Sequence, residues 1–378
     1  MRVGLDATPL IGARTGIGRY VASLLPGLAA LYAPSGNDLV ATAFTLRGRG
    51  ELAALLPPGV VDRSRAVPAR LLQEVWARTE HPSVTALIGR VDVFHGTNFV
   101  LPPPGRARGV VTVHDLTFLH SPGTVSATSR RLRELVPRAL QRAAVVCTPS
   151  RAVADEVADA YGLPIDRVQV TPLGVDEAWA ATPAPDVDWL AARGLPPRYA
   201  LFVGTIEPRK MLPTLLAAKR QLAGTDAGSV PLVVLGPTGW GPQLDLTGLG
   251  GGQVVLTGYR TDDEVRAIVA GAAVLAFPSA AEGFGLPPLE AFAAGVPVVA
   301  SDLPVIREVL GHDGTPSSAA RATLVPVGDA AALAAALADR LDRPDPPGAA
   351  DARRAWAARY TWAATAGATA EAYRRAAA

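Results

Sequence analysis

Two adjacent cations, Arg209 and Lys210, end a short apolar run near the middle of the chain. The apolar run that includes Phe202 is followed by a sharp turn at Gly204-Thr205, and the two cations come a few residues after this turn. Arginine offers a planar fork of hydrogen-bond donors and lysine a compact charge, a pairing suited to a diphosphate. The sequence contains only one other lysine, so a lysine at this turn is an unusual choice. We therefore predict an anion site here.

Two glutamates, Glu282 and Glu290, flank a glycine-rich turn later in the chain. Pro287 or Pro288 suits the first turn of a helix whose backbone amides point back at that turn, and Gly295 suits its end. Eight helical residues span about 12 Å, whereas glycoside hydrolases hold their two carboxyl groups between about 5 and 9.5 Å apart. The spacing therefore favours two hydroxyl-binding points on one elongated ligand over a hydrolytic pair.

Two further candidates lie in the N-terminal half. The glycines of Gly12–Tyr20, among them Gly16 and Gly18, could bring backbone amides to an anion at a helix start, or simply make a turn. His114, followed by Asp115, could bond to a sugar hydroxyl or polarise a group near a reacting carbon, or it could bond to a nearby carbonyl.

These residues need elements that position them. Short β-branched segments alternate with Ala/Leu-rich helical patterns along almost the whole chain, which is typical of parallel sheets built from βαβ units. Two series of strands are expected, separated by a proline-rich stretch at 176–198. They are 1–6, 39–46, 91–95, 110–114, 144–149 and 168–173, then 199–203, 231–235, 254–257, 273–277, 297–301 and 324–327.

This pattern predicts an α/β protein with two Rossmann-like, doubly wound domains. In open parallel sheets, ligands bind at the carboxyl ends of the strands. The candidate segments all follow expected strands, so we expect them to line a cleft between the two sheets.

Composition excludes several classes of function. The 378 residues carry a formal net charge of +2, so nucleic acid is not expected as the main partner. Cys147 is the only cysteine, which rules out an intrachain disulfide. We find no apolar run long enough to span a bilayer, and we expect a cytoplasmic protein. The basic segment from Arg130 to Arg142 could be a solvated helix face or could contact phospholipid or acceptor at the inner face of the membrane.

The order and spacing of these motifs resemble the retaining glycosyltransferases of family 4, also called group 1, which have the GT-B fold. Their pattern of Glu, seven residues, Glu is met by Glu282 to Glu290, and their basic donor loop by Gly204 to Lys210. The Gly-Thr-Ile-Glu-Pro-Arg-Lys variant resembles that of mannosyltransferases that build cell-surface polysaccharides. Further matches are Gly12–Tyr20, His114-Asp115, Thr148-Pro149-Ser150, 172–175 and Gly258-Tyr259.

The resemblance implies roles for individual residues. Arg209 and Lys210 would hold the donor diphosphate, Glu282 the hydroxyls of the transferred sugar, Glu290 the ribose, and His114 would touch the donor sugar. Other expected donor-binding positions are Gly16, Gly18, Gly204, Thr205, Gly283, Phe284, Gly285 and Leu286, with Tyr259 and Arg260 beside the nucleobase. No metal and no cofactor are expected.

One position departs from the family pattern. Met211 stands where many relatives carry asparagine after the Arg-Lys pair, which affects the expected packing of this loop. The resemblance also implies three parts: an acceptor domain over 1–178, a donor domain over 179–355, and a C-terminal helix over 356–378 that returns to the first domain.

The resemblance implies transfer of a hexose from a nucleotide sugar to a hydroxyl of a sugar, lipid-linked or small-molecule acceptor, with retention of configuration. GDP-mannose is preferred over a UDP-hexose as the donor. A nucleotide-dependent oxidoreductase is disfavoured because Gly16-Ile-Gly18 does not continue into G-x-G-x-x-G. A non-catalytic nucleotide-sugar-binding protein stays open as an alternative.

Overall fold

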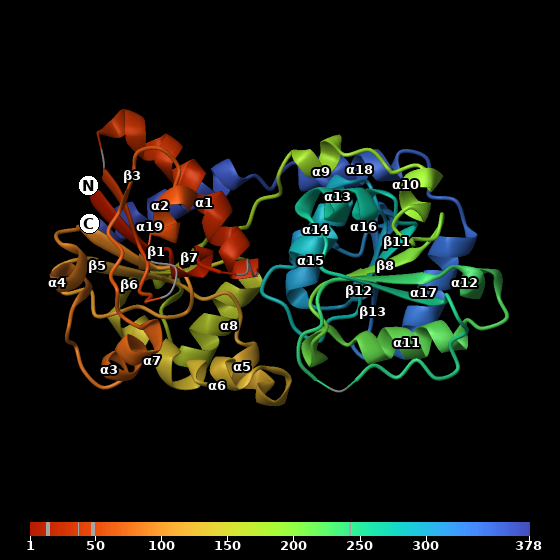
Figure 1. The fold of residues 1–378 in the computed structure, drawn as a ribbon, viewed down its shortest axis with the longest axis horizontal. Coiled ribbons are helices and arrows are strands. Elements are labelled where there is room, and N and C mark those ends of the chain that lie inside the picture. The colour runs from red at the N-terminus through yellow and green to blue at the C-terminus, as the bar shows by residue number, and fades with distance from the viewer. Residues whose placement is uncertain (13–15, 37, 47–49, 242) are drawn as a thin grey trace. The chain divides into compact units, whose positions relative to one another are not determined.

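The computed structural model describes residues 1–12, 16–36, 38–46, 50–241 and 243–378. The chain divides into two compact units (Figure 1). The first comprises Met1–Pro122, Ala127–Gly174 and Thr361–Ala378, and the second comprises Gly123–Ser126 and Val175–Tyr360. The chain therefore passes from the first unit to the second at Gly174/Val175 and returns to the first at Tyr360/Thr361. The predicted domain boundaries lie at 178/179 and 355/356.

In the first unit, the described strands form a seven-stranded parallel sheet in the order β3-β2-β1-β4-β5-β6-β7. Their bounds are β1 Arg2–Asp6, β2 Asp38–Thr42, β3 Val60–Asp62, β4 Val93–Gly96, β5 Arg108–Thr112, β6 Ala143–Thr148 and β7 Val168–Val170. The helices are α1 Gly16–Tyr32, α2 Glu51–Leu55, α3 Ala69–Trp76, α4 Val84–Ile88, α5 Thr117–His120, α6 Ala127–Arg130, α7 Leu132–Arg142, α8 Arg151–Tyr161 and α19 Trp362–Ala377.

In the second unit, six parallel strands have the order β10-β9-β8-β11-β12-β13 among the described residues. They are β8 Ala200–Val203, β9 Leu232–Leu235, β10 Val254–Gly258, β11 Val274–Phe277, β12 Val298–Ser301 and β13 Ala322–Val325. The helices are α9 Ala178–Ala181, α10 Val187–Ala191, α11 Leu212–Gln221, α12 Asp226–Ser229, α13 Asp262–Ala270, α14 Leu286–Ala293, α15 Pro304–Leu310, α16 Pro316–Arg321, α17 Ala330–Asp342 and α18 Ala349–Ala357.

The C-terminal helix α19 packs along α1 and against β5, β6 and β7, although its sequence follows the second unit. The two helices approach closely at Gly27, where an added Cβ would lie 2.8 Å from the Cβ of Ala366. Tyr373 of α19 is completely buried. The end of the chain is therefore part of the core of the first unit.

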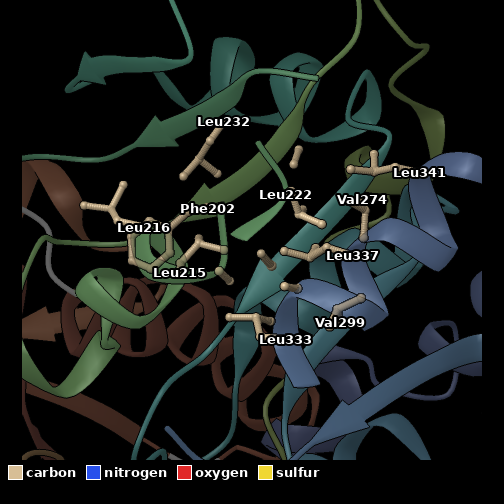
Figure 2. Packing of buried hydrophobic residues seen from close by; sticks show 14 of the residues in the cluster. Phe202, Leu215, Leu216, Leu222, Leu232, Val274, Val299, Leu333, Leu337 and Leu341 are labelled. Carbon is tan, nitrogen blue, oxygen red and sulfur yellow. The ribbon is translucent and has the colours of Figure 1, made fainter. Parts of the chain in front are cut away.

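One face of the second sheet is packed by the leucine-rich helices α11 and α17 (Figure 2). Phe202 and Val234 of the sheet meet Leu215 of α11 and Leu337 of α17 in this cluster. Apolar side chains here are essentially excluded from water, which contributes about 25 cal/mol per Å² of buried surface. This core fixes the strands whose carboxyl ends carry the candidate residues.

The sequence pattern missed one strand and overestimated others. β3 contains only Val60–Asp62, too short a segment to show a periodic pattern. β2 ends at Thr42 instead of residue 46, because Phe44 makes only an isolated bridge to Arg65. β5 ends at Thr112, so His114 lies just beyond the strand.

Candidate functional site

The predicted anion site and the first glutamate meet at one edge of the second sheet. β8 and β11 pair side by side in parallel, so the segments that follow them emerge at the same edge. Lys210 Nζ lies 2.6 Å from Glu282 Oε1, and Arg209 Nη1 lies 2.9 Å from Glu282 Oε2. The structure thus brings together three residues that the sequence singled out in two separate segments.

These side chains are largely withdrawn from water. Glu282 is 9% exposed, Lys210 10% and Arg209 20% at the side chain. Two further hydrogen bonds join the two segments: Arg209 Nη1 donates to the carbonyl of Ala281 at 2.8 Å, and the Ala280 N–H donates to the carbonyl of Arg209 at 2.9 Å. The Lys210 ammonium lies 4.7 Å from the centre of the Phe277 ring, which adds a cation–π contact. The charges are held in place by both loops.

The carboxyl group of Glu282 is ionised in this setting. Burial alone would raise its pKa, but the charges of Arg209 and Lys210 and the hydrogen bond from Lys210 outweigh burial and lower the pKa to about 2. The Ser279 hydroxyl also favours the ionised form, although it is buried without a hydrogen bond of normal geometry. Glu282 is therefore a hydrogen-bond acceptor at any ordinary pH.

A second acidic residue, Glu207, belongs to this cluster, and sequence reasoning gave it no role. Its Oε1 lies 2.6 Å from Arg209 Nη2, and its side chain is 8% exposed. Arg209 is thus held between two carboxylates and cannot swing freely. The signal that could have revealed Glu207 is its place directly before Pro208 in a loop of otherwise assigned residues.

The turn before α14 has the predicted helix-start geometry. Gly285 adopts φ +91°, a left-handed conformation that only glycine takes without strain, and a proline occupies the first turn of the helix. Phe284 is buried and packs edge-to-face on Tyr360, while Gly283 and Leu286 are half-buried. The turn is rigid, and its backbone amides lie at the start of a helix.

Glu290 lies within α14, and only 3% of its surface is exposed. Gly295, with φ +83°, follows the end of the helix as predicted. Glu290 and Glu282 therefore lie on different elements, the helix and the loop before it.

A neighbouring loop, residues 236–241, packs against the loop that carries Arg209 and Lys210. Ile206 donates its backbone N–H to the carbonyl of Pro237 at 3.0 Å and accepts from the N–H of Gly239 at 3.2 Å. An added Cβ on Gly239 would lie 2.5 Å from the methyl of Thr205. Gly236 is needed because any side chain there would strike the carbonyl of Gly204, at 2.2 Å. Thr205 and Gly204 are thus fixed by packing between two loops.

The residues expected beside the nucleobase follow β10. Tyr259 is 80% exposed. Nη1 of Arg260 lies 3.6 Å from a carboxylate oxygen of Glu264, in the first turn of α13. An exposed ring and a half-buried guanidinium at the end of an edge strand can both offer a flat surface to an aromatic ligand.

His114 belongs to the first unit. Its Nε2 lies 2.9 Å from the backbone carbonyl of Thr97, so Nε2 carries the proton and donates it. Burial lowers the pKa of His114, and the bond to Thr97 and the charge of Asp115 oppose only part of this effect. A neutral imidazole with this tautomer leaves Nδ1 able to accept a hydrogen bond from a hydroxyl group. The carbonyl bond that the sequence offered as an alternative is present as well.

The glycines of the first loop are only partly described. Gly16 begins α1 and is exposed, and Gly18, two residues later, is buried. Residues Ala13, Arg14 and Thr15 of the predicted anion loop lie outside the described residues.

The basic segment at 130–142 is partly neutralised. Arg131 pairs with Glu74, and Arg142 pairs with Glu80 at 2.6 Å with its side chain only 9% exposed. Two of its cations therefore serve the packing of this unit. None of the described helices is long and apolar enough to cross a membrane.

Lys219, the second lysine, has a structural role. It is 7% exposed and donates to the carbonyls of Gly228 and Val230, at 2.5 and 2.6 Å. Burial lowers its pKa. In a chain that otherwise uses arginine, one lysine lies among the candidate site residues and the other anchors α12.

Comparison with known proteins now adds to this geometry. Residues 197–343 match the family model described as glycosyl transferases group 1, and residues 14–179 match glycosyltransferase family 4. The chain is 28% identical over 341 residues to the O-antigen chain mannosyltransferase B of Escherichia coli, covering 83% of this chain and 86% of that protein.

It is also 30% identical over 307 residues to a glycogen synthase of Mycobacterium tuberculosis, covering 75% of this chain and 69% of the relative. Among solved structures, HepE of Anabaena in complex with UDP and glucose superimposes with a TM-score of 0.71 at 19% identity, over 98% of each chain. The chain belongs to the family 4, group 1 glycosyltransferases and has their GT-B fold.

Proposed function

We propose that this glycosyltransferase moves a mannosyl group from GDP-mannose to an acceptor hydroxyl in polysaccharide, glycolipid or glycoconjugate synthesis, with retention of configuration and without a metal ion. The similarity to an O-antigen mannosyltransferase supports the choice of sugar. A UDP-hexose is the alternative donor, supported by the likeness to a glycogen synthase and to HepE, whose structure contains UDP and glucose.

The observation that carries the proposal is the buried cluster of Arg209, Lys210 and Glu282. The two cations supply the charge that a departing diphosphate needs, and charge-assisted bonds strengthen as its negative charge grows. Glu282, permanently ionised, accepts hydrogen bonds from hydroxyls of the transferred sugar. When the donor arrives, the diphosphate takes over part of the contact that Glu282 now makes with the cations.

The remaining residues take the positions that the family resemblance gives them. Glu290 binds the ribose hydroxyls, His114 accepts a hydrogen bond from the donor sugar through Nδ1, and Tyr259 with Arg260 lies beside the base. The backbone of Gly283 to Leu286 receives sugar and phosphate at the start of α14. Gly16 and Gly18 lie near the phosphate and the acceptor.

Retention follows if the acceptor attacks from the side that the diphosphate leaves. The departing phosphate oxygen then takes the acceptor proton, and the protein contributes charge stabilisation and exclusion of water instead of a strong nucleophile. We place the reaction in the cytoplasm, at or near the inner face of a membrane when the acceptor is lipid-linked.

The first experiment is a thermal-shift screen of GDP, UDP and ADP, because a ligand at 100 times its Kd stabilises a protein by about 2.7 kcal/mol. Transfer and hydrolysis are then assayed with GDP-mannose and UDP-glucose, and NMR of the product gives its anomeric configuration. An α-linked donor should yield an α-linked product.

Each arm can contradict a different part of the proposal. A β-linked product excludes retention, and preference for a sugar phosphate without a nucleoside excludes the donor class. Binding of a nucleotide sugar with no turnover for any acceptor would favour the non-catalytic alternative.

A further inference from the structure

His114 lies in a box of aromatic rings in the first unit. The Tyr20 ring meets the His114 ring at a centroid distance of 5.1 Å and an angle of 79°, and the Phe99 ring meets it at 5.4 Å and 72°. Both are edge-to-face contacts, which orient an aromatic ring as well as bury it. Together with the bond from Nε2 to the Thr97 carbonyl, they restrict the imidazole to one orientation.

The backbone is strained to place one of these rings. Phe99 adopts φ +60°, a conformation that a bulky residue rarely takes and that tends to occur at functional sites. Its amide donates to the carbonyl of Thr112 at 2.9 Å, and its ring also packs on Phe118. A hydrogen bond to strand β5 and the buried ring of Phe118 therefore keep Phe99 in this strained conformation.

The other ring is tied to a buried chain of polar side chains. The Tyr20 hydroxyl lies 3.2 Å from Thr112 Oγ1, which lies 2.7 Å from His95 Nε2. His95 Nδ1 lies 2.8 Å from the hydroxyl of Tyr373 in the C-terminal helix α19. All four side chains are essentially inaccessible to water, so each bond is costly to break. The sequence prediction assigned no role to any of them.

The bonding pattern of His114 is asymmetric. A carbonyl can only accept, so Nε2 is the protonated nitrogen, and none of the described residues bonds to Nδ1. Turning the ring over about the Cβ–Cγ bond would place Cε1 where Nε2 now lies, so the bond to the Thr97 carbonyl, which selects the Nε2–H tautomer, would be lost. The aromatic edges on two sides oppose that rotation.

We propose that Tyr20 and Phe99 are positioning residues that hold His114 as the Nε2–H tautomer, so that Nδ1 accepts a hydrogen bond from a hydroxyl of the transferred sugar. The chain through Thr112, His95 and Tyr373 anchors Tyr20 to α19. This inference rests on the proposed function for the contact with sugar, but the tautomer is a property of the free protein.

The test begins with the protein alone. Long-range ¹H–¹⁵N NMR of histidine rings reports each tautomer, and the His114→Ala variant identifies the His114 signals among those of the five histidines. We expect the Nε2–H form in the natural protein and a mixture of tautomers in Phe99→Leu and in Tyr20→Leu. Phe44→Leu is the matched control, because it removes a buried ring of the same unit that packs on Trp76 instead of on Phe99 or His114.

The second arm is kinetic. Phe99→Leu should lower kcat/KM for the nucleotide sugar roughly 3- to 10-fold, the rate equivalent of one aromatic pair, and leave affinity for the nucleoside diphosphate unchanged. In a His114→Ala background the same substitution should cause no further loss, since the positioned group is gone.

An unchanged tautomer in both leucine variants overturns the proposal, and so does a loss of kcat/KM that persists in the His114→Ala background. If only one variant folds, that variant decides the result. If the natural protein turns over no nucleotide sugar, the proposed function fails, while the NMR arm still decides whether Tyr20 and Phe99 position His114.

Discussion

Lys210 and Glu282 lie face to face in the second unit, with Nζ 2.6 Å from Oε1 across 72 positions of sequence. Each satisfies the other in a site that largely excludes water. A nucleotide sugar that binds here must exchange this contact for contacts with its own phosphate and hydroxyl groups. Glu282 can therefore hold the Lys210 ammonium in place before the donor binds and release it to the diphosphate afterwards.

Lys210→Ala and Arg209→Ala should each lower kcat/KM by roughly 30- to 1,000-fold, because a preorganised charge at a leaving group stabilises the transition state by about 2–4 kcal/mol. Folding should survive, since Glu282 keeps its other cation in each variant. Steady-state kinetics and thermal unfolding measure the two effects. Arg343→Ala, which removes a largely exposed cation from an i,i+4 pair, is the control.

Lys210→Arg should restore only part of the activity, because a planar fork does not reproduce a compact ammonium between Glu282 and the Phe277 ring. Near-normal kinetics and nucleoside-diphosphate affinity in the alanine variants would show that the donor binds elsewhere.

Turnover should not depend on a divalent metal, because Arg209 and Lys210 supply positive charge at the diphosphate. Activity measured before and after prolonged dialysis against a chelator tests this expectation. Loss of activity that Mg²⁺ or Mn²⁺ restores would contradict it.

Stability should fall in acid through Glu282. Its pKa is about 2 in the folded protein, below its ordinary value of 4.5, so the folded state binds fewer protons between these values. The resulting stabilisation, on the order of 3 kcal/mol, is present above pH 4.5 and is lost as pH falls towards 2. Urea unfolding of the natural protein and of Glu282→Gln should show free energies of unfolding that converge across this window. Parallel curves would contradict the assignment.

A second loss of stability should begin at higher pH through His95. Burial, aided by the charge of His114, lowers the pKa of His95 from 6.5 to about 3. The unfolded chain therefore takes up a proton below pH 6.5 that the folded protein refuses until about pH 3. Stability falls with decreasing pH by about 1.4 kcal/mol per pH unit from this group.

His95→Gln should remove that slope between pH 6.5 and 4.5, above the window of Glu282. Tyr373→Phe is the matched control, because it removes a bond to His95 Nδ1 but leaves the titrating ring in place. An identical slope in the natural protein and in His95→Gln would refute the assignment.

Met211→Asn should stabilise the protein by about 0.5–1 kcal/mol. Met211 adopts φ +49° and ψ +38°, a left-handed conformation that asparagine tolerates better than other non-glycine residues. This conformation gives a physical reason for the asparagine that the family resemblance implies at this position. Thermal unfolding checks the gain, and a loss would mean that packing of the methionine near Gly328 outweighs the backbone strain.

The sequence alone predicted the alternation of strands and helices, the glycine that ends α14, and the residue types at the ends of β8 and β11. These follow from local rules, because periodicity, turn residues and helix caps are properties of neighbouring positions. The family motifs added order and spacing. Strand β3 was not predicted, because its three residues are too few to show a periodic pattern.

Tertiary structure decided which charges meet. No local rule could indicate that Arg209 would lie between Glu207 and Glu282, because its contact with Glu282 depends on the packing of one loop against its neighbour. His95 and Tyr373 meet only because α19 returns to the first sheet across 278 positions. The sequence determined which groups could do chemistry, whereas the packing of distant elements determined their partners, their charge states and, for His114, which nitrogen carries the proton.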